Sequence, residues 1–339
     1  MARSCRPDAV RYQVGIESFR LRPDGGEVAY VRRHVSGSSY HSHLWSVSID
    51  GGSARQLTRG AVRDSSPAYS PDGTQLAFVR TPDGADHGQP WILPHGGGEP
   101  WPLATMAHGV SSVSWSPDGQ WLALLAPSAD DRPFIVGPEE AGKSPRARRI
   151  TSLDWRDDEQ GHRDRRVHLY LIRPRADARP QRLTGGDWDV LHPAWAPDSR
   201  SIAFTTDQHA ERDLDPRSSV WVVDVAGGQP REQVALQGDA DFPAYSPDGT
   251  RLACLGRDAA DAPEYAPLDP WLVPADGGQA AQIALETDGL VGTWAWSELD
   301  LIEGAPGPLW LDAASLVCLI AGLRPRRCFD ALSGRRLDN

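Results

Sequence analysis

The amino-acid sequence predicts an all-β fold, because one strand-turn-strand unit recurs along most of its length. Each copy joins an aromatic residue, a Pro-Asp turn and an apolar strand, as in Ala68-Tyr-Ser-Pro-Asp-Gly-Thr-Gln-Leu-Ala-Phe78. Seven copies occur in the 339 residues. When they are aligned on the proline of the complete copies, that position falls at 23, 71, 117, 157, 197, 247 and 298, so that the copies lie 40 to 51 residues apart. This period is typical of propeller blades. We therefore predict a seven-bladed β-propeller of four-stranded blades, and leave open whether the last blade is complete.

Each copy carries the signals of a hairpin. In the Ser-Pro-Asp-Gly turns the proline presets φ, the aspartate can bond to the backbone, and the glycine accepts a positive φ. The flanking residues alternate in polarity or are β-branched and aromatic, as strands prefer. Most copies continue with a third strand, a Gly-Gly turn and a short fourth strand, as at 44–47, 51–52 and 55–58. The 13 tryptophans fall mostly at equivalent positions, and we expect them to pack between blades.

The repeat also sets the predicted domain bounds. Residues 1–14 form a lead-in, residues 15–316 the propeller, and residues 317–339 an atypical tail that holds two of the four cysteines. The blades are expected near 15–60, 61–105, 106–150, 150–186, 187–236, 237–286 and 287–316. Two of them rest on degenerate copies, at 154–158 and 295–298. If the seventh blade lacks a good fourth strand, its open edge favours self-association.

Composition argues against several classes of function. The formal net charge of −11 disfavours nucleic-acid binding, which needs clustered Lys and Arg. No run of about 18 apolar residues predicts a membrane span, and the N-terminus lacks the apolar region of a secretory signal. The four cysteines have no Cys-x-x-Cys spacing, and Cys254 takes a strand position that apolar residues fill in other copies. No disulfide framework is therefore expected, which favours the reducing cytoplasm.

The chain has no recognisable catalytic apparatus. An α/β-hydrolase needs Gly-x-Ser-x-Gly followed by an acid and a histidine. The sequence has no Gly-x-Ser-x-Gly, and all ten histidines lie at or before His209. A glycine-rich phosphate loop with its Lys-Ser/Thr is absent as well. We therefore predict no catalytic, cofactor-binding or metal-binding residues and no cofactor.

One weak pattern could bind a substrate. Glu139 and Glu140 form a paired carboxylate in the long loop of the third predicted blade, where they could hold a substrate ammonium in the central funnel. The alternative is a solvated loop in which the pair balances nearby basic residues. These are Lys143, Arg146, Arg148 and Arg149.

Two further patterns could bind metal ions. His41 and His43 lie two residues apart and could face one side of a strand as metal ligands. The Ser- and Gly-rich composition beside them favours a solvated hairpin. Asp258, Asp261 and Glu264 share one loop, but they lack the tight ligand register of a calcium loop.

The stretch 131–172 carries a family resemblance. It contains Arg149-Ile-Thr, then Asp154-Trp-Arg, then Asp164-Arg and His168-Leu. This order resembles the mid-propeller segment of acylaminoacyl-peptidase-type serine peptidases of family S9. The Ser-Pro-Asp-Gly repeats resemble those of TolB-like proteins and of the prolyl oligopeptidase clan, and the likeness covers roughly residues 15–300. In the S9 family the propeller caps an α/β-hydrolase domain and restricts access to short or unfolded peptides.

Two classes of function follow from this resemblance. The first is the non-catalytic, substrate-gating propeller of an S9-type peptidase, truncated or frame-shifted near residues 300–320, before the hydrolase domain. The alternative is a stand-alone TolB-like scaffold that binds a protein partner. In either class the expected partners are peptides or a protein, bound through the funnel or loops. An enzyme acting within the funnel is the least favoured class, because no catalytic set converges at equivalent blade positions.

Overall fold

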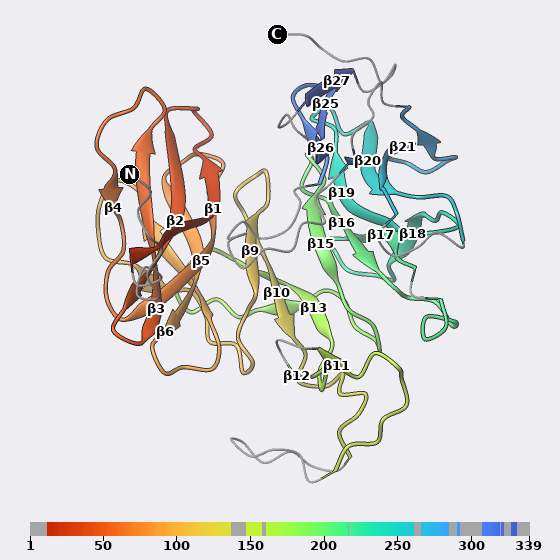
Figure 1. Ribbon diagram of the computed structural model, residues 1–339, viewed down its shortest axis with the longest axis horizontal. Coiled ribbons are helices and arrows are strands. Elements are labelled where there is room, and N and C mark those ends of the chain that lie inside the picture. Colours follow the sequence, from red (N-terminus) through yellow and green to blue (C-terminus); the bar gives the residue numbers. More distant parts are fainter. Residues whose placement is uncertain are drawn as a thin grey trace, which may run out of the picture. The chain divides into compact units, whose positions relative to one another are not determined.

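The protein is described by a computed structural model (Figure 1). The description covers residues 12–136, 147–157, 161–215, 217–260, 266–284, 290–291, 307–318, 320–321 and 327–330. Strands make up the regular structure of these ranges, which contain no α-helix, and the all-β prediction is confirmed. The chain forms two compact units. One is Met1–Ala126, Tyr170–Gln181 and Ala295–Glu303, and the other is Pro127–Leu169, Arg182–Trp294 and Gly304–Asn339.

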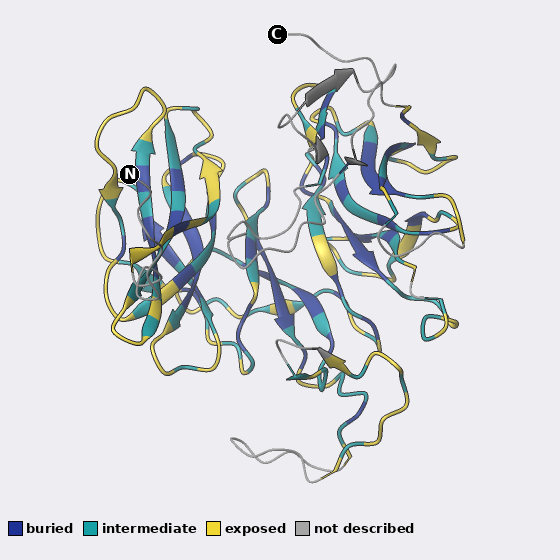
Figure 2. Ribbon diagram, viewed as in Figure 1, coloured by how far each residue is buried: buried dark blue, intermediate teal, exposed yellow. Residues whose placement is uncertain are grey.

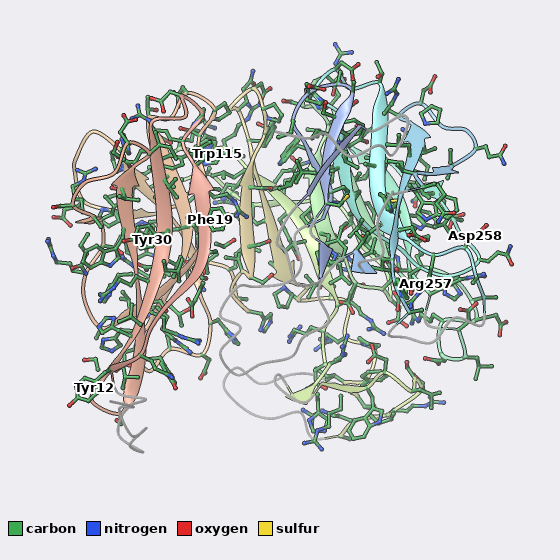
Figure 3. The ribbon with its side chains drawn as sticks, turned by 45° about the horizontal axis from the view of Figure 1, so that its top comes forward. Tyr12, Phe19, Tyr30, Trp115, Arg257 and Asp258 are labelled. Carbon is green, nitrogen blue, oxygen red and sulfur yellow. The ribbon has the colours of Figure 1, made fainter. Side chains whose placement is uncertain are left out.

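Two groups of four antiparallel strands open the first unit. Within each group the strands pair in chain order, and a single parallel bridge between Ser42 and Arg63 joins the groups. Phe19 and Tyr30, labelled in Figure 3, are cross-strand partners on β1 and β2. The strands are β1 (Val14–Leu21), β2 (Glu27–Ser36), β3 (Ser39–Ser48), β4 (Arg55–Gln56), β5 (Val62–Tyr69), β6 (Gln75–Pro82), β7 (Gln89–Pro94) and β8 (Trp101–Pro102).

The next four-stranded sheet contains a long insertion. Its strands are β9 (Ser112–Trp115), β10 (Leu122–Pro127), β13 (Val167–Ile172) and β14 (Gln181–Arg182). They lie in the order β14-β13-β10-β9, and residues 128–166 connect its second and third strands. This insertion holds the short hairpin β11 (Arg156–Asp157) and β12 (Gly161–His162).

The predicted separation of blades 106–150 and 150–186 is therefore wrong, because both ranges supply strands to this one sheet. The degenerate copy at 154–158 misled the prediction. It has an aromatic residue, Trp155, but neither the proline nor the apolar strand that follows the turn in complete copies. Without that strand, the segment contributes only the short strand β11, which pairs with β12 within the insertion.

Two more four-stranded sheets belong to the second unit, and each pairs in chain order. The fourth sheet consists of β15 (Leu191–Trp195), β16 (Ser201–Thr206), β17 (Ser219–Asp224) and β18 (Arg231–Val234). The fifth consists of β19 (Ala240–Tyr245), β20 (Arg251–Gly256), β21 (Asp269–Pro274) and β22 (Ala281–Gln282).

The C-terminal segment contains a copy of the repeat that was not predicted from the sequence. Strands β24 (Leu309–Trp310), β25 (Ser315–Cys318) and β27 (Arg327–Asp330) form one sheet, and β23 (Leu290–Val291) pairs with β26 (Ile320–Ala321). Trp310 Nε1 donates to the carbonyl of Ala244 (3.0 Å), just as Trp115 Nε1 donates to the carbonyl of Ala68 (3.0 Å).

The predicted boundary between the propeller at 15–316 and a tail at 317–339 is therefore wrong, because β25 crosses it and β27 lies beyond it. The copy was hidden because Asp312-Ala-Ala replaces Pro-Asp-Gly in its turn. The degenerate copy at 295–298 lies outside the described residues. The total of seven blades stays a prediction.

The repeated turn explains the regularity of the sheets. Ser70 Oγ donates to Asp72 Oδ1 (2.6 Å) and accepts from the N–H of Gln75 (2.9 Å), while Gly73 has a φ of 69°. The turns that begin at Ser116 and Ser246 repeat these hydrogen bonds. The predicted roles of the aspartate and the glycine are confirmed, since Asp72 Oδ1 also accepts from the N–H of Thr74 (3.0 Å) and Gly73 has a positive φ. Behind the turns, the second strands β6, β10, β16 and β20 are buried almost throughout (Figure 2).

Candidate functional site

The first strands of three sheets share an unusual bulge. Strands β5, β15 and β19 each shift register just before a proline. The residues before these prolines are Ser66, His192 and Phe242, with φ of 51°, 46° and 54°. A proline has no N–H to leave unpaired, which suits a bulge. A left-handed conformation costs a non-glycine residue about 1–3 kcal/mol, so the surrounding structure must hold it in place.

Two of these bulges meet in the second unit. The rings of His192 and Phe242 stack with centroids 4.0 Å apart and planes at 24°. His192 Nδ1 donates to Asp241 Oδ1 (2.6 Å), which also accepts from Thr205 Oγ1 (2.6 Å) and from the N–H of Phe242 (2.6 Å). Burial on its own raises the pKa of Asp241. The hydrogen bond and charge of His192, with the Thr205 hydroxyl, outweigh burial and hold that pKa below its usual range.

The backbone of Phe242 is closely packed, whereas part of the His192 side chain is exposed to solvent. Gly307 packs against Phe242 so closely that a Cβ at Gly307 would lie 2.6 Å from Phe242 Cβ and 3.1 Å from its carbonyl oxygen. By contrast, 40% of the His192 side chain is exposed. The neighbouring Leu191 is 47% exposed. The imidazole is therefore held rigidly while part of it faces solvent.

His192 and Phe242 hold equivalent positions in successive copies of the repeat, and the sequence analysis did not single out either residue. The available signal was a second repeat, in which one variable residue precedes Pro-Ala and an aromatic. It occurs at 66–69, 192–195 and 242–245. Aligning these copies places Ser66, His192 and Phe242 at one position of the first strand.

A buried ionic cluster anchors the C-terminal end of the insertion. Arg166 is 3% exposed, and its guanidinium contacts Asp187 Oδ1 (2.8 Å) and Asp189 Oδ2 (3.1 Å). Asp189 also accepts from the N–H of Val167 (2.6 Å), and Arg212 pairs with Asp187 (2.8 Å). These contacts join the start of β13 and the connection 207–218 to residues 187–189.

Asp207 gives this cluster an excess of carboxylates. It directly follows β16, as Arg257 directly follows β20, where Arg257 Nε donates to Asp239 (2.8 Å). Figure 3 marks Arg257 beside Asp258. Burial raises the pKa of Asp207, and the charge of Asp189 adds to the rise, although Arg212 and Arg166 oppose it. Arg166 therefore supplies the cation that the fourth sheet lacks at this position.

The start of the insertion is anchored by a buried histidine. His168 is fully buried, and its Nε2 lies 3.1 Å from Asp131 Oδ2 and 3.2 Å from the carbonyl of Gly186. Asp131 also pairs with Arg182. Burial lowers the pKa of His168, and the charge of Arg182 lowers it further, although Asp131 opposes the change. The two anchors fix both ends of residues 128–166.

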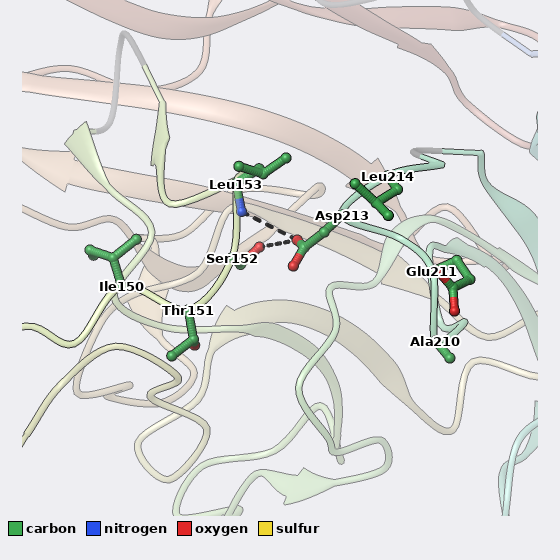
Figure 4. Close-up of a pocket in the computed structure, with 8 residues that line it drawn as sticks. All are labelled: Ile150, Thr151, Ser152, Leu153, Ala210, Glu211, Asp213 and Leu214. Carbon is green, nitrogen blue, oxygen red and sulfur yellow. Dashed lines mark hydrogen bonds between the residues drawn. The ribbon is translucent and has the colours of Figure 1, made fainter.

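An open pocket lies between this insertion and the connection 207–218 (Figure 4). Its cavity volume is about 650 Å³. Ser152 Oγ and the N–H of Leu153 both donate to Asp213 Oδ1, which ties the two segments together. Leu153 and Leu214 are 72% and 80% exposed. The pocket therefore presents apolar side chains to solvent, and it includes part of the stretch that carries the family resemblance.

The predicted substrate-binding pair, Glu139 and Glu140, lies outside the described residues. Of the basic residues near it in sequence, Arg148 is described, and it pairs with Asp164 (Nε–Oδ1 2.7 Å). Asp258 accepts from the N–H of Gln237 (2.8 Å), while Asp261 and Glu264 lie outside the described ranges.

His41 and His43 gather with a third histidine. His34 on β2 pairs across the sheet with His41, and the three ring centroids are 5.5–6.3 Å apart. His43 Nε2 lies 2.9 Å from the carbonyl of Gly60. Within the described ranges, no three His, Cys, Asp or Glu side chains are arranged to hold a metal ion. In the same ranges, no helix is long and apolar enough to cross a membrane.

Comparison with known proteins gives relatives of two kinds. No protein-family model matches the chain. It is 26% identical over 219 residues to the uncharacterized peptidase YuxL of Bacillus subtilis, which covers 64% of this chain and 33% of YuxL. It is 32% identical over 106 residues to a TolB homologue of Chlorobium luteolum, which covers 31% of this chain and 23% of that protein. The chain thus spans about a third or less of these relatives.

Solved structures show the same fold. The acylaminoacyl peptidase of Pyrococcus horikoshii matches with a TM-score of 0.64 and 14% identity, over 95% of this chain and 45% of that one. The β-propeller domain of the Trilobed protease of Pyrococcus furiosus matches with a TM-score of 0.59 and 13% identity, over 93% of this chain and 82% of that one. The chain is therefore a β-propeller protein homologous to S9 peptidases and to TolB-like proteins, aligned with their propeller portions.

Proposed function

We propose that the chain is the non-catalytic, substrate-selecting propeller of an S9-type peptidase, which admits short or unfolded peptides to a hydrolase domain. The observation that carries the proposal is the alignment with YuxL, in which 64% of this chain matches only 33% of a peptidase. The rigidly anchored insertion at 128–166 supports it, because a propeller needs no such insertion to close its sheets. The pocket at Ile150–Leu153 and Ala210–Leu214 gives this insertion a surface that could contact a peptide.

The test is a chimera in which this chain replaces the propeller of YuxL. Its kcat/KM is measured for a short acyl-peptide anilide and for a peptide of about 40 residues, beside the YuxL hydrolase portion alone. We expect the chimera to prefer the short substrate at least about tenfold more than the hydrolase portion does. Equal selectivity of the two proteins would overturn the proposal. The isolated chain should hydrolyse neither substrate and should not be labelled by a fluorophosphonate.

The proposal requires a hydrolase domain as the partner of this propeller. Reading the gene in all three frames downstream of codon 280 tests how it is supplied. A shifted frame encoding Gly-x-Ser-x-Gly, followed by Asp and His, supports a truncated or frame-shifted peptidase. We also propose a cytoplasmic location, with which the two described free cysteines, Cys254 and Cys318, are compatible. Burial raises the pKa of each thiol to about 12, which keeps both unreactive.

A TolB-like binding scaffold is the second candidate, and the alignment with the TolB homologue favours it. For such a scaffold the partner is a folded protein, not a peptide that passes to a hydrolase domain. Chemical crosslinking in cells followed by mass spectrometry separates the two. A stoichiometric protein partner, together with an unselective chimera, would favour the scaffold.

A further inference from the structure

We propose that the stack of His192 and Phe242 is a peptide subsite, which binds an aromatic side chain of the peptide against the accessible face of His192. The inference rests on the proposed function, in which this propeller handles peptides. It goes further by naming the residues that contact the peptide and the class of side chain that they select.

The fold does not require rings at these positions. The same bulge before a proline is built in β5 with Ser66, whose hydroxyl accepts a hydrogen bond from the N–H of Val113 (3.4 Å). At the matching place before Pro308, the C-terminal copy has Gly307, which has no side chain at all. Small residues therefore suffice to form this part of a blade. An imidazole and a phenyl ring at two successive copies are additional to what the backbone needs.

The imidazole is preorganised for a ligand. Asp241 Oδ1 lies 2.6 Å from His192 Nδ1, and an ionised carboxylate can only accept, so Nδ1 carries the proton. Thr205 and the N–H of Phe242 fix the same carboxylate oxygen. This arrangement leaves Nε2 as the ring nitrogen available to a ligand. Because the ring is already held, a ligand that binds it avoids the entropic cost of ordering it.

The stack defines the chemistry of the ligand. Phe242 covers one face of the imidazole, yet 40% of the His192 side chain remains exposed. A third ring on the opposite face would extend the stack at the centroid separations that aromatic pairs prefer, about 4.5–7 Å. Nε2 can accept from a peptide N–H when the ring is neutral, and it can donate to a peptide carbonyl when the ring is protonated. An aromatic residue within a peptide backbone supplies both contacts.

The test uses the full chain and two blocked peptides, N-acetyl-Ala-Phe-Ala-amide and N-acetyl-Ala-Ala-Ala-amide. Calorimetry gives Kd for each, and NMR follows the His192 Cε1–H signal, which the ring current of a bound phenyl group should shift upfield. We expect the Phe peptide to bind at least about 3-fold more tightly than the Ala peptide, and His192→Ala to remove this preference. Phe242→Leu keeps an apolar side chain beside His192, and it should weaken the preference without abolishing binding.

His162→Ala is the matched control. His162 also lies beside an aromatic ring, Trp155 (5.6 Å between centroids), but it lies away from the stack, so the preference should be unchanged. Far-ultraviolet circular dichroism and thermal unfolding confirm that each variant is folded.

Equal affinity for the two peptides, or a preference that survives in folded His192→Ala, overturns the subsite. A selective chimera in the preceding experiment would still leave the gating function standing. If the chimera is unselective while the Phe peptide contacts His192, the subsite stands and the gating function fails.

Discussion

The fourth and fifth sheets, β15–β18 and β19–β22, share one framework but differ at equivalent positions. Both pair in chain order and bulge before a proline, and each closes its first turn with the same backbone hydrogen bonds. The differing positions, fourth sheet first, are His192 and Phe242, Ala196 and Ser246, Ser199 and Gly249, and Asp207 and Arg257. The backbone of a blade therefore depends on few side chains, whereas its charge balance and its surface can vary.

The two sheets differ most clearly in which part of the chain supplies the arginine that pairs with the aspartate before the first strand. The fifth sheet pairs Asp239 with its own Arg257, while the fourth sheet has Asp207 at the position of Arg257 and depends on Arg166, the last residue of the insertion before β13. This charge, supplied by the insertion itself, links the insertion to the fourth sheet. We therefore predict that Arg166 stabilises the packing of the insertion against the fourth sheet, in addition to its own ion pairs.

The largest effect is expected for Arg166→Ala. It leaves Asp189 without the buried cation that it contacts, and we expect a loss of about 3 kcal/mol in the free energy of unfolding. Arg212→Ala is the control, because its partner Asp187 is 58% exposed, and it should cost less than about 1 kcal/mol. Urea denaturation measures both. Equal costs for the two variants would show that the cluster is not held by Arg166.

A second variant sharpens the comparison. Adding Asp207→Arg to Arg166→Ala puts an arginine after β16. It could then pair with Asp189 as Arg257 pairs with Asp239 in the fifth sheet. We expect the double variant to recover a measurable part of the lost stability. No recovery would mean that the position after β16 cannot accept the arginine as the position after β20 does.

The next largest effect concerns the turn. Ser246 is fully buried, and its hydroxyl donates to Asp248 and accepts from the N–H of Arg251. Ser246→Ala leaves the part-buried N–H of Arg251 without its hydroxyl partner, and we expect a cost of about 1–2 kcal/mol. Ala196 holds the same position in the fourth sheet, so Ala196→Ser should stabilise by a smaller amount. Thermal unfolding tests both, and opposite signs for the two substitutions support the shared role.

Asp207 adds a prediction about pH. Because its pKa is raised in the folded state, the folded protein binds the proton more tightly than the unfolded chain does. This carboxylate therefore destabilises at neutral pH, and its penalty disappears as pH falls through the raised pKa towards the unfolded value of about 3.9. Asp207→Asn should stabilise by up to about 1 kcal/mol at pH 7, with a gain that shrinks at low pH. A gain that does not depend on pH contradicts the assignment.

The sequence predicted those features that depend on neighbouring residues. The turn at Ser70–Gln75 and the buried strand after it follow from local chemistry, so the repeat revealed them. Trp155 was misread because an aromatic residue alone does not specify a blade. The pairing of His192 with Asp241 joins residues 49 positions apart. It depends on which first strands lie side by side, which no local pattern states. Glu139 and Glu140 stay a prediction.

The smallest effect is expected at Ser199 and Gly249, and it tests the framework most directly. Both residues occupy the left-handed region, with φ of 62° and 71°. Gly249→Ser should cost about 1 kcal/mol from the backbone alone, since the nearest atom to a new Cβ, Pro197 Cδ, is 3.8 Å away. Ser199→Gly relieves the same strain but makes the unfolded chain more flexible and removes a buried hydroxyl, so any net gain should stay below about 0.5 kcal/mol. Urea denaturation of both variants measures the difference. If Ser199→Gly destabilises instead, contacts of the Ser199 side chain outweigh backbone strain, and the two turns are equivalent in shape but not in energy.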